Sequence, residues 1–162
     1  MELKEAYQLA VSLINSTQND YGLPQNLDFA FDRAKRRLGS YRPKQLRITL
    51  SAPISLLNNE SVIDEIIRHE IAHALAHHHD DDLGHGNLWK KWARKMKAKP
   101  RASCQSADVI TPPAPYVYVC PNCSFRAERY RRPARNRGQA GCPNCSNSDY
   151  FQPLKFIVNR RS

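Results

Sequence analysis

One short run of the sequence has the residue types and spacing of a catalytic zinc site. Residues 69–73 read His-Glu-Ile-Ala-His, the His-Glu-x-x-His pattern. On a helix, residues four apart share a face at about 6 Å, so His69 and His73 can hold one ion. Bound zinc lowers the pKa of water towards about 7, and Glu70 can accept the proton. The motif therefore predicts a metallopeptidase site with Glu70 as the catalytic general base.

The third zinc ligand has to be chosen among the residues that follow this motif. His79 stands at the spacing of the metzincin pattern, but Ala76 occupies the position where that pattern needs glycine. His85 lies between Gly84 and Gly86, in a segment that is able to bend back towards the motif. We favour His85 as the third ligand, with His79 as the alternative. Further candidates in this stretch are His77, Asp80, Asp81 and Asp82.

A helix that starts near Ser61 is expected to carry the motif. Residues 61–64 fit the capping-box pattern, and the helix should end before Gly84. Apolar residues recur every four positions and form a stripe for burial: Ile63, Ile67, Ile71 and Leu75. A further helix is expected over 87–99, with an apolar side made by Leu88, Trp89, Trp92 and Met96. Its other side is basic, with Lys90, Lys91, Arg94, Lys95 and Lys97.

The rest of the chain predicts an α+β fold with an appended module. Residues 2–19 have helical periodicity, and apolar residues alternate in short pieces between 27 and 54, which indicates a small antiparallel sheet of about three strands. We therefore assign residues 1–99 to a domain of helices packed on this sheet. Residues 100–115 are rich in proline and are expected to be a linker. A basic module should occupy 116–162.

Two cysteine pairs in this last module predict a structural zinc site. Cys120 and Cys123 form one Cys-Pro-Asn-Cys knuckle, and Cys142 and Cys145 form the second after a spacer of 18 residues. This is the spacing of a four-cysteine zinc ribbon, in which four thiolates leave no open position for water or substrate. The ribbon is expected to be structural and its strands to flank the knuckles. Cys104, in the linker, is most simply a free thiol.

Positive charge is concentrated in the ribbon and suggests a polyanionic partner. The chain has a net charge of +10, and residues 116–162 hold nine Lys or Arg against two acids. The residues expected to bind nucleic acid lie between the knuckles: Arg126, Arg129, Tyr130, Arg131, Arg132, Arg135 and Arg137. Arginines interleaved with aromatic rings suit phosphates and unpaired bases, so binding of DNA, single-stranded or duplex, should tolerate any sequence. The alternative is a solvated basic hairpin that keeps the module soluble.

The sequence gives no sign of export or of a membrane partner. No signal peptide is evident at the start, and no run of 18 apolar residues occurs. We therefore expect a cytoplasmic or nucleoid-associated protein, or a nuclear one in a eukaryote.

Taken together, these motifs resemble the SprT/Spartan group of zinc metalloproteases, in its bacterial type with a C-terminal zinc ribbon. The resemblance is carried by 59–61 (Asn-Glu-Ser), by 69–74 (His-Glu-Ile-Ala-His-Ala), by 84–86 (Gly-His-Gly) with Trp89, by the preceding 38–54 region and by the cysteine pairs. It implies a minigluzincin-like catalytic domain in which the third histidine, His85, binds zinc. It also implies repair by proteolysis of proteins on DNA, such as DNA–protein crosslinks. The alternative function is a non-enzymatic nucleic-acid-binding zinc protein with a structural histidine–metal site.

Overall fold

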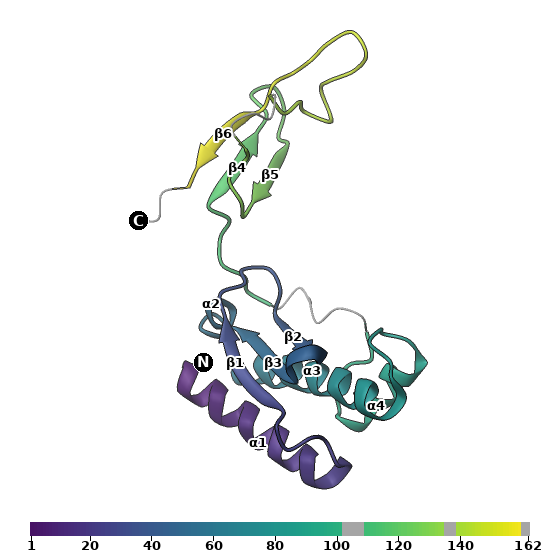
Figure 1. Cartoon of the computed structure of the whole chain (residues 1–162). Helices are drawn as coiled ribbons and strands as arrows, with labels where there is room; N and C mark the ends of the chain where they lie inside the picture. The colour runs from purple at the N-terminus through teal and green to yellow at the C-terminus, as the bar shows by residue number, and fades with distance from the viewer. Residues whose placement is uncertain (102–108, 135–138, 160–162) are drawn as a thin grey trace. The chain divides into compact units, whose positions relative to one another are not determined.

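The computed structural model of the protein describes residues 1–101, 109–134 and 139–159. It divides into two compact units, Met1–Pro112 and Pro113–Ser162, and each is considered by itself. Figure 1 shows the elements of both units. Three residues singled out in the sequence, Cys104, Arg135 and Arg137, lie outside the described residues.

The first unit begins with a long helix and a small sheet. Helix α1 covers Leu3–Tyr21, and Gly22 closes it in the left-handed conformation with φ 67°. The strands are β1 (Asp28–Asp32), β2 (Gly39–Arg42) and β3 (Arg47–Ser51), with the short 3-10 helix η1 (Pro43–Gln45) between the last two. They pair in the order β1-β3-β2, so β2 forms an edge of the sheet.

The direction of one strand differs from the prediction. β2 and β3 are antiparallel neighbours, as expected, but β1 runs parallel to β3. The sheet is therefore mixed. The reason is that β3 pairs with both earlier strands and lies between them, so β1 and β2 are not neighbours and do not form a hairpin. The α+β class itself is confirmed.

Among the described residues of this unit, three further helices follow the sheet: α2 (Ala52–Ser55), α3 (Glu60–Asp80) and α4 (Asn87–Lys95). Helix α3 begins two residues earlier than a cap at Ser61 would place it, because the Asn59 side chain accepts a hydrogen bond from the Val62 amide and caps the helix. Helix α4 ends at Lys95 instead of 99, and the chain turns through Lys97 at φ 59°.

The core of this unit forms around α3. The predicted stripe is confirmed, because Ile63, Ile67, Ile71 and Leu75 all have 0% exposed surface. α3 packs against α1, α4 and the strands β2 and β3, and Figure 1 shows it passing beside the sheet. Burial on several sides makes α3 a rigid support for the motif that it carries.

Asparagine side chains hold the last residues of the first unit and the first residues of the second. In the first unit, the Asn58 side chain donates to the carbonyl oxygen of Ile110 at 2.8 Å and accepts from its amide at 2.9 Å. In the second unit, the Asn159 side chain donates to the Ala114 carbonyl oxygen at 2.8 Å, and the Asn159 backbone amide donates to the Pro115 carbonyl oxygen. The chain is thus held on each side of the unit boundary.

The second unit is a three-stranded antiparallel ribbon with two cysteine turns. Its strands are β4 (Tyr116–Val119), β5 (Arg126–Arg129) and β6 (Lys155–Val158), in the order β5-β4-β6. The first cysteine turn joins β4 to β5, and the second precedes β6. Among the residues that the structure describes, no helix combines the length and the apolar character needed to cross a membrane.

Candidate functional site

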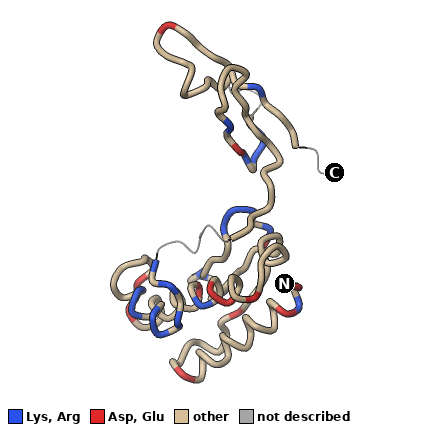
Figure 2. The backbone as a smooth tube through the Cα atoms, turned by 180° about the vertical axis from the view of Figure 1, so that it is seen from behind, with Lys and Arg blue, Asp and Glu red and all other residues tan. Residues whose placement is uncertain are grey.

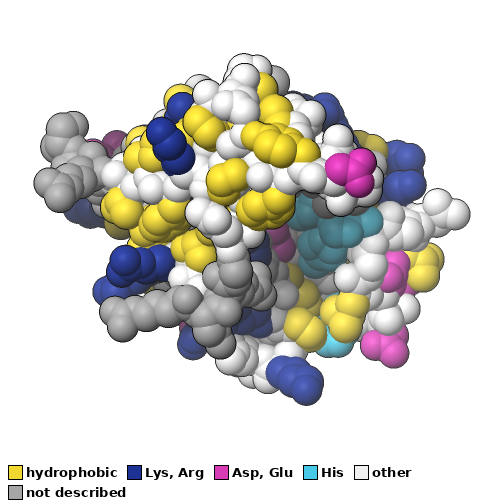
Figure 3. Space-filling model, turned by 90° about the horizontal axis from the view of Figure 1, so that it is seen from above, with side chains coloured by type: hydrophobic (Ala, Val, Ile, Leu, Met, Phe, Trp, Pro, Cys, Tyr) yellow, Lys and Arg dark blue, Asp and Glu magenta, His cyan; other side chains and the backbone are white. Residues whose placement is uncertain are grey.

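Three histidines predicted as metal ligands come together in the first unit. The Nε2 atom of His85 lies 3.0 Å from that of His73 and 3.2 Å from that of His69. Their donor atoms all lie within 4.8 Å of one another. Figure 3 shows one large patch of histidine side chains on the surface.

This arrangement has the size of a zinc site. Tetrahedral zinc with Zn–N bonds of about 2.0–2.1 Å holds neighbouring nitrogens about 3.3 Å apart. Three imidazole nitrogens that point at one another within this distance suit a shared cation better than a set of mutual hydrogen bonds. The donor set is therefore consistent with zinc and leaves a fourth position for water or substrate.

His79, the alternative third ligand, is placed elsewhere. Its Nε2 lies 2.9 Å from the Tyr21 carbonyl oxygen at the end of α1, and its ring stacks on Trp92 at 4.9 Å. His77 pairs instead with the Tyr41 hydroxyl at 3.0 Å. The structure thus brings His85, and not these two histidines, to His69 and His73.

The acidic run after α3 forms the turn that delivers His85. Asp81 adopts the left-handed conformation with φ 50°, which an aspartate tolerates, and its amide and that of Asp82 satisfy carbonyls of the last helical turn. The Asp82 carboxylate then accepts a hydrogen bond from the Gly84 amide at 2.7 Å, while Asp80 accepts from Trp92. These carboxylates, which were candidate ligands, are engaged in the fold of the loop.

Trp89 supports all three imidazoles from α4. Its side chain is fully buried. Its ring centroid lies 4.8 Å from the ring of His69, 5.2 Å from that of His73 and 4.6 Å from that of His85. Aromatic packing on three sides restricts the rotamers of the histidines, so α4 contributes to the geometry of the donor set.

The histidines are held in the neutral form that binds metal. Burial lowers the pKa of His69 to about 4, with the charge of His85 adding to the effect. Burial also lowers the pKa of His73 to about 3, and His69 and His85 contribute in the same direction. The pKa of His85 is lowered by burial as well, against the opposing charge of Asp82. Because metal binding requires deprotonated donors, protons compete weakly for this site at neutral pH.

Glu70 is buried beside the histidines and is held by the edge strand β2. Its Oε2 accepts a hydrogen bond of 2.8 Å from the backbone amide of Tyr41. Burial raises its pKa to about 7, while the Tyr41 amide and the charge of Arg37 act in the opposite direction. A carboxyl group with a pKa near 7 is suited to accept and return a proton at neutral pH.

Gly39 allows this close approach of α3 to the sheet. A Cβ atom at this position would lie 2.9 Å from Glu70 Cγ and 3.0 Å from the Thr49 carbonyl oxygen.

We expect Gly39→Ala to displace the Glu70 side chain and to lower kcat for peptide hydrolysis at least tenfold, with the zinc content unchanged because the histidines stay in place. The measurement is kcat with metal analysis of the same sample. Full activity of Gly39→Ala at the wild-type zinc content would contradict the role.

Sequence reasoning missed the contribution of β2 to the site. Gly39 and the Tyr41 amide act on Glu70 from a strand about thirty residues away, which motif spacing does not report. A glycine inside a strand was the available signal, because it often marks a close approach of another part of the chain.

The four cysteines of the second unit form a second donor group. Cys120 Sγ lies 3.9 Å from Cys145 Sγ, and Cys123 Sγ lies 3.7 Å from Cys142 Sγ. Tetrahedral zinc with Zn–S bonds of about 2.3 Å places neighbouring sulfurs about 3.8 Å apart. The cysteines are free of disulfides, and their thiolates fit a closed structural zinc site.

The arginines predicted to bind nucleic acid are exposed where the structure describes them, but they do not share one face. These are Arg126, Arg129, Arg131 and Arg132, with Tyr130 half-buried. Arg129 pairs with Tyr116 across the strands and Arg126 with Val119, so the two lie on opposite faces of the ribbon.

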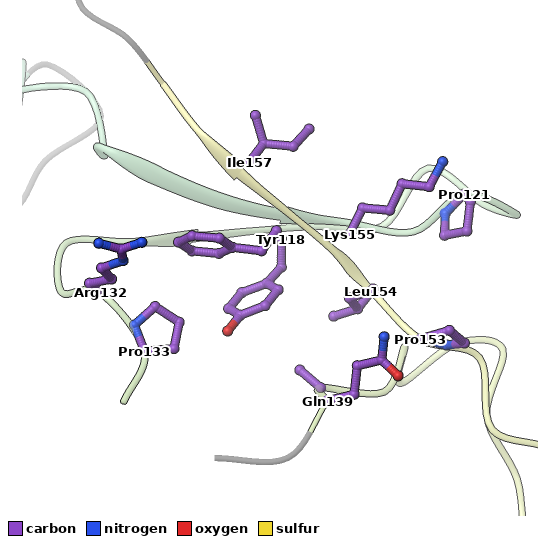
Figure 4. Close-up of a pocket in the computed structure, with 11 residues that line it drawn as sticks. Tyr118, Pro121, Arg132, Pro133, Gln139, Pro153, Leu154, Lys155 and Ile157 are labelled. Atoms are coloured by element: carbon purple, nitrogen blue, oxygen red, sulfur yellow. The ribbon is translucent and has the colours of Figure 1, made fainter. Parts of the chain in front are cut away.

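One face of the ribbon carries aromatic rings and a pocket. Tyr116 and Phe156 stack with centroids 5.5 Å apart, and Tyr118 lies 5.4 Å from the same phenyl ring. Tyr118 and Phe156 also line a pocket of about 780 Å³ together with Arg132, Lys155 and other residues. Figure 4 shows Tyr118 in this pocket between Arg132 and Leu154. Cations beside exposed rings suit an anionic ligand with flat aromatic groups.

Comparisons with known proteins agree with the motifs. The model of the SprT-like family matches residues 5–108. The chain is similar to Protein SprT of Erwinia tasmaniensis, with 28% identity over 113 residues that cover 67% of this chain and 65% of that protein, so it spans just under two thirds of that relative's length. It is also similar to Protein SprT of Yersinia pseudotuberculosis serotype IB, with 26% identity over 125 residues that cover 74% of this chain and 70% of that protein. Because the family model covers well over half of the sequence, the chain belongs to the SprT-like family.

Proposed function

We propose that this protein is a zinc metalloendopeptidase that cleaves proteins held on DNA, including DNA–protein crosslinks. Its membership in the SprT-like family and its two potential metal sites support a zinc-dependent, protease-type function. The observation that carries the proposal is the convergence of three neutral imidazoles beside a buried carboxyl group that is held in place from a neighbouring strand.

His69, His73 and His85 are the residues that would hold the catalytic zinc. When bound, zinc supplies a Lewis acid that makes water more acidic and polarises a carbonyl group. Glu70 accepts the proton from the attacking water and returns it to the leaving amine, the role of a general base held beside the metal donors. The Tyr41 amide keeps the carboxyl group in position, and Trp89 keeps the imidazoles oriented.

The DNA part of the proposal rests on the ribbon. Its exposed arginines and the aromatic face of Tyr116, Tyr118 and Phe156 provide phosphate contacts and surfaces for base stacking. Such contacts do not read base edges, so the binding should be independent of sequence and strongly dependent on salt. The ribbon then raises the concentration of DNA-bound proteins near the catalytic unit.

The test compares cleavage of one protein substrate in two forms, free in solution and crosslinked to single-stranded DNA. We expect the crosslinked form to be cleaved at least tenfold faster at low salt. This preference should shrink when Arg129 and Arg132 are both changed to Gln, and it should persist when Lys4 and Lys44, two exposed cations of the first unit, are changed in the same way.

Two results would contradict the proposal in different ways. Equal cleavage of both substrate forms would indicate a peptidase for soluble substrates, with an incidental basic ribbon. No cleavage of either form by a protein with zinc confirmed in the histidine site would favour the non-enzymatic, nucleic-acid-binding alternative.

A further inference from the structure

We propose that helix α4 and the residues after it form a second contact with the nucleic-acid backbone, located on the catalytic unit itself. This inference rests on the proposed function for its partner, but it concerns a surface that lies outside the ribbon. The residues involved, called here the α4 basic segment, are Lys90, Lys91, Arg94, Lys95, Lys97, Lys99 and Arg101.

The α4 basic segment is one of two runs of positive charge in the first unit that contain no acidic residue; the other is 33–47. It contains seven cations in twelve residues, and no acidic residue occurs between positions 83 and 101. By contrast, residues 1–115 as a whole have a net charge of only +3. Figure 2 shows Lys and Arg gathered along α4. Positive charge in this unit is therefore gathered in two runs, and in the 33–47 run three arginines, Arg37, Arg42 and Arg47, are already in ion pairs.

The cations of α4 point outward because its apolar side is buried. Trp89, Trp92 and Ala93 are buried against the rest of the unit. Lys91, Arg94 and Lys95 are exposed. At 100° per residue these three share the side opposite the tryptophans, so they form one cationic face.

The charges of this face are not neutralised within the fold. Among the described residues of the first unit, the cations in ion pairs are Arg37, Arg42, Arg47 and Arg68. None of these belongs to the α4 basic segment. Two of its side chains are instead ordered by an aromatic ring, since the ammonium groups of Lys95 and Lys91 lie 4.5 Å and 5.4 Å from the Trp92 ring. Ordering of this kind reduces the entropy lost when an anion binds.

The face lies next to the candidate catalytic site. Trp89 on the buried side of α4 contacts all three histidines. His85 precedes the first residue of α4 by two positions. Because a helix with its side chains is about 10–12 Å across, an anion on the outer face is about one helix diameter from the histidines. A strand bound there would hold an attached protein within reach of the site.

A phosphate backbone fits this face better than a membrane surface does. A helix that lies in a membrane interface inserts an apolar face into the lipid. The apolar side of α4 is already used in the core, and Leu88 is its one large apolar residue that the structure shows exposed, at 44%. A cationic face with little exposed apolar surface beside it suits a partner that presents regularly spaced phosphates.

The test measures binding of the full, zinc-loaded chain to a single-stranded oligonucleotide over a range of salt concentrations. The variants are Lys91→Gln with Arg94→Gln on the α4 face, and Lys4→Gln with Lys44→Gln as a control of equal charge. We expect the α4 pair to reduce the slope of log K against log salt by about 1.4, since each lost phosphate contact of a single strand accounts for about 0.7. The control pair should leave the slope unchanged.

Further measurements separate this inference from a folding defect and from the proposed function. Hydrolysis of a short free peptide should be unchanged in the α4 pair, and Lys99→Gln with Arg101→Gln, outside the helix, should also reduce the slope. If both pairs keep the control slope while Arg129→Gln with Arg132→Gln loses affinity, the inference is overturned and the proposed function stands. If the α4 pair loses binding only to phosphatidylserine vesicles, the partner is a membrane and the inference is overturned.

Discussion

Replacing Glu70 with glutamine is expected to lower the rate of peptide hydrolysis by about two to four orders of magnitude, the usual contribution of a general base. Glutamine has the same shape and can still accept the hydrogen bond of the Tyr41 amide, but it cannot take a proton from water. The zinc content should be unchanged, because the converging donors belong to the three histidines. Hydrolysis of a fluorogenic peptide and metal analysis of the same preparation measure the two effects.

Glu60→Gln provides the matched control for this experiment. Glu60 lies in the first turn of the same helix and is exposed, so the same chemical change there should leave hydrolysis at the wild-type rate. Wild-type activity of Glu70→Gln would assign the general base to another group. Loss of zinc together with activity would instead indicate that the carboxylate is a metal ligand.

Removal of the ribbon zinc is expected to unfold the second unit while the first remains folded. The buried cluster around the knuckles is small and consists of Cys120, Cys142 and Leu154, so two of its three buried residues are also candidate metal donors. A structural zinc site of this kind contributes roughly 10–16 kcal/mol of binding free energy to folding. The first unit has its own extensive core around α3 and does not share this dependence.

Hydrogen exchange of the variant Cys142→Ser measures this prediction. Amides of β4, β5 and β6 should lose protection, and those of α1 and α3 should keep it. Cys104→Ser is the control, since it removes a thiol that belongs to neither knuckle. A Cys142→Ser protein with a protected ribbon would show that its sheet is stable without the metal.

Local sequence signals predicted the elements that bear the site. The spacing of Ile63, Ile67, Ile71 and Leu75 identified the buried side of α3 because side-chain direction repeats with the helix period. The glycines around His85 identified the segment that turns back. The doubled cysteine pattern identified the ribbon, because the ligand spacing of a metal site is itself a local property.

Such local signals do not predict contacts between segments that are far apart in the sequence. Alternating apolar residues show that a strand has two faces, but they do not give its direction, so the parallel pairing of β1 with β3 was not predicted. The bond from Tyr41 to Glu70 depends on the placement of β2 against α3, which results from the packing of the whole unit. Asn59 and Ser61 are both good capping residues, and only the geometry of the preceding chain decides between them.

The amide contacts on each side of the unit boundary limit how far the two units can diffuse apart. Asn58 holds Ile110, and Asn159 holds Ala114, so only three residues, 111–113, lie between the anchors, and two of them are proline. Fully extended, this connection spans no more than about 14 Å. A short tether makes an encounter between partners held on the two units intramolecular, with an effective concentration set by its length and stiffness. Under the proposed function, a protein on DNA that is captured by the ribbon would meet the candidate catalytic site as an intramolecular partner.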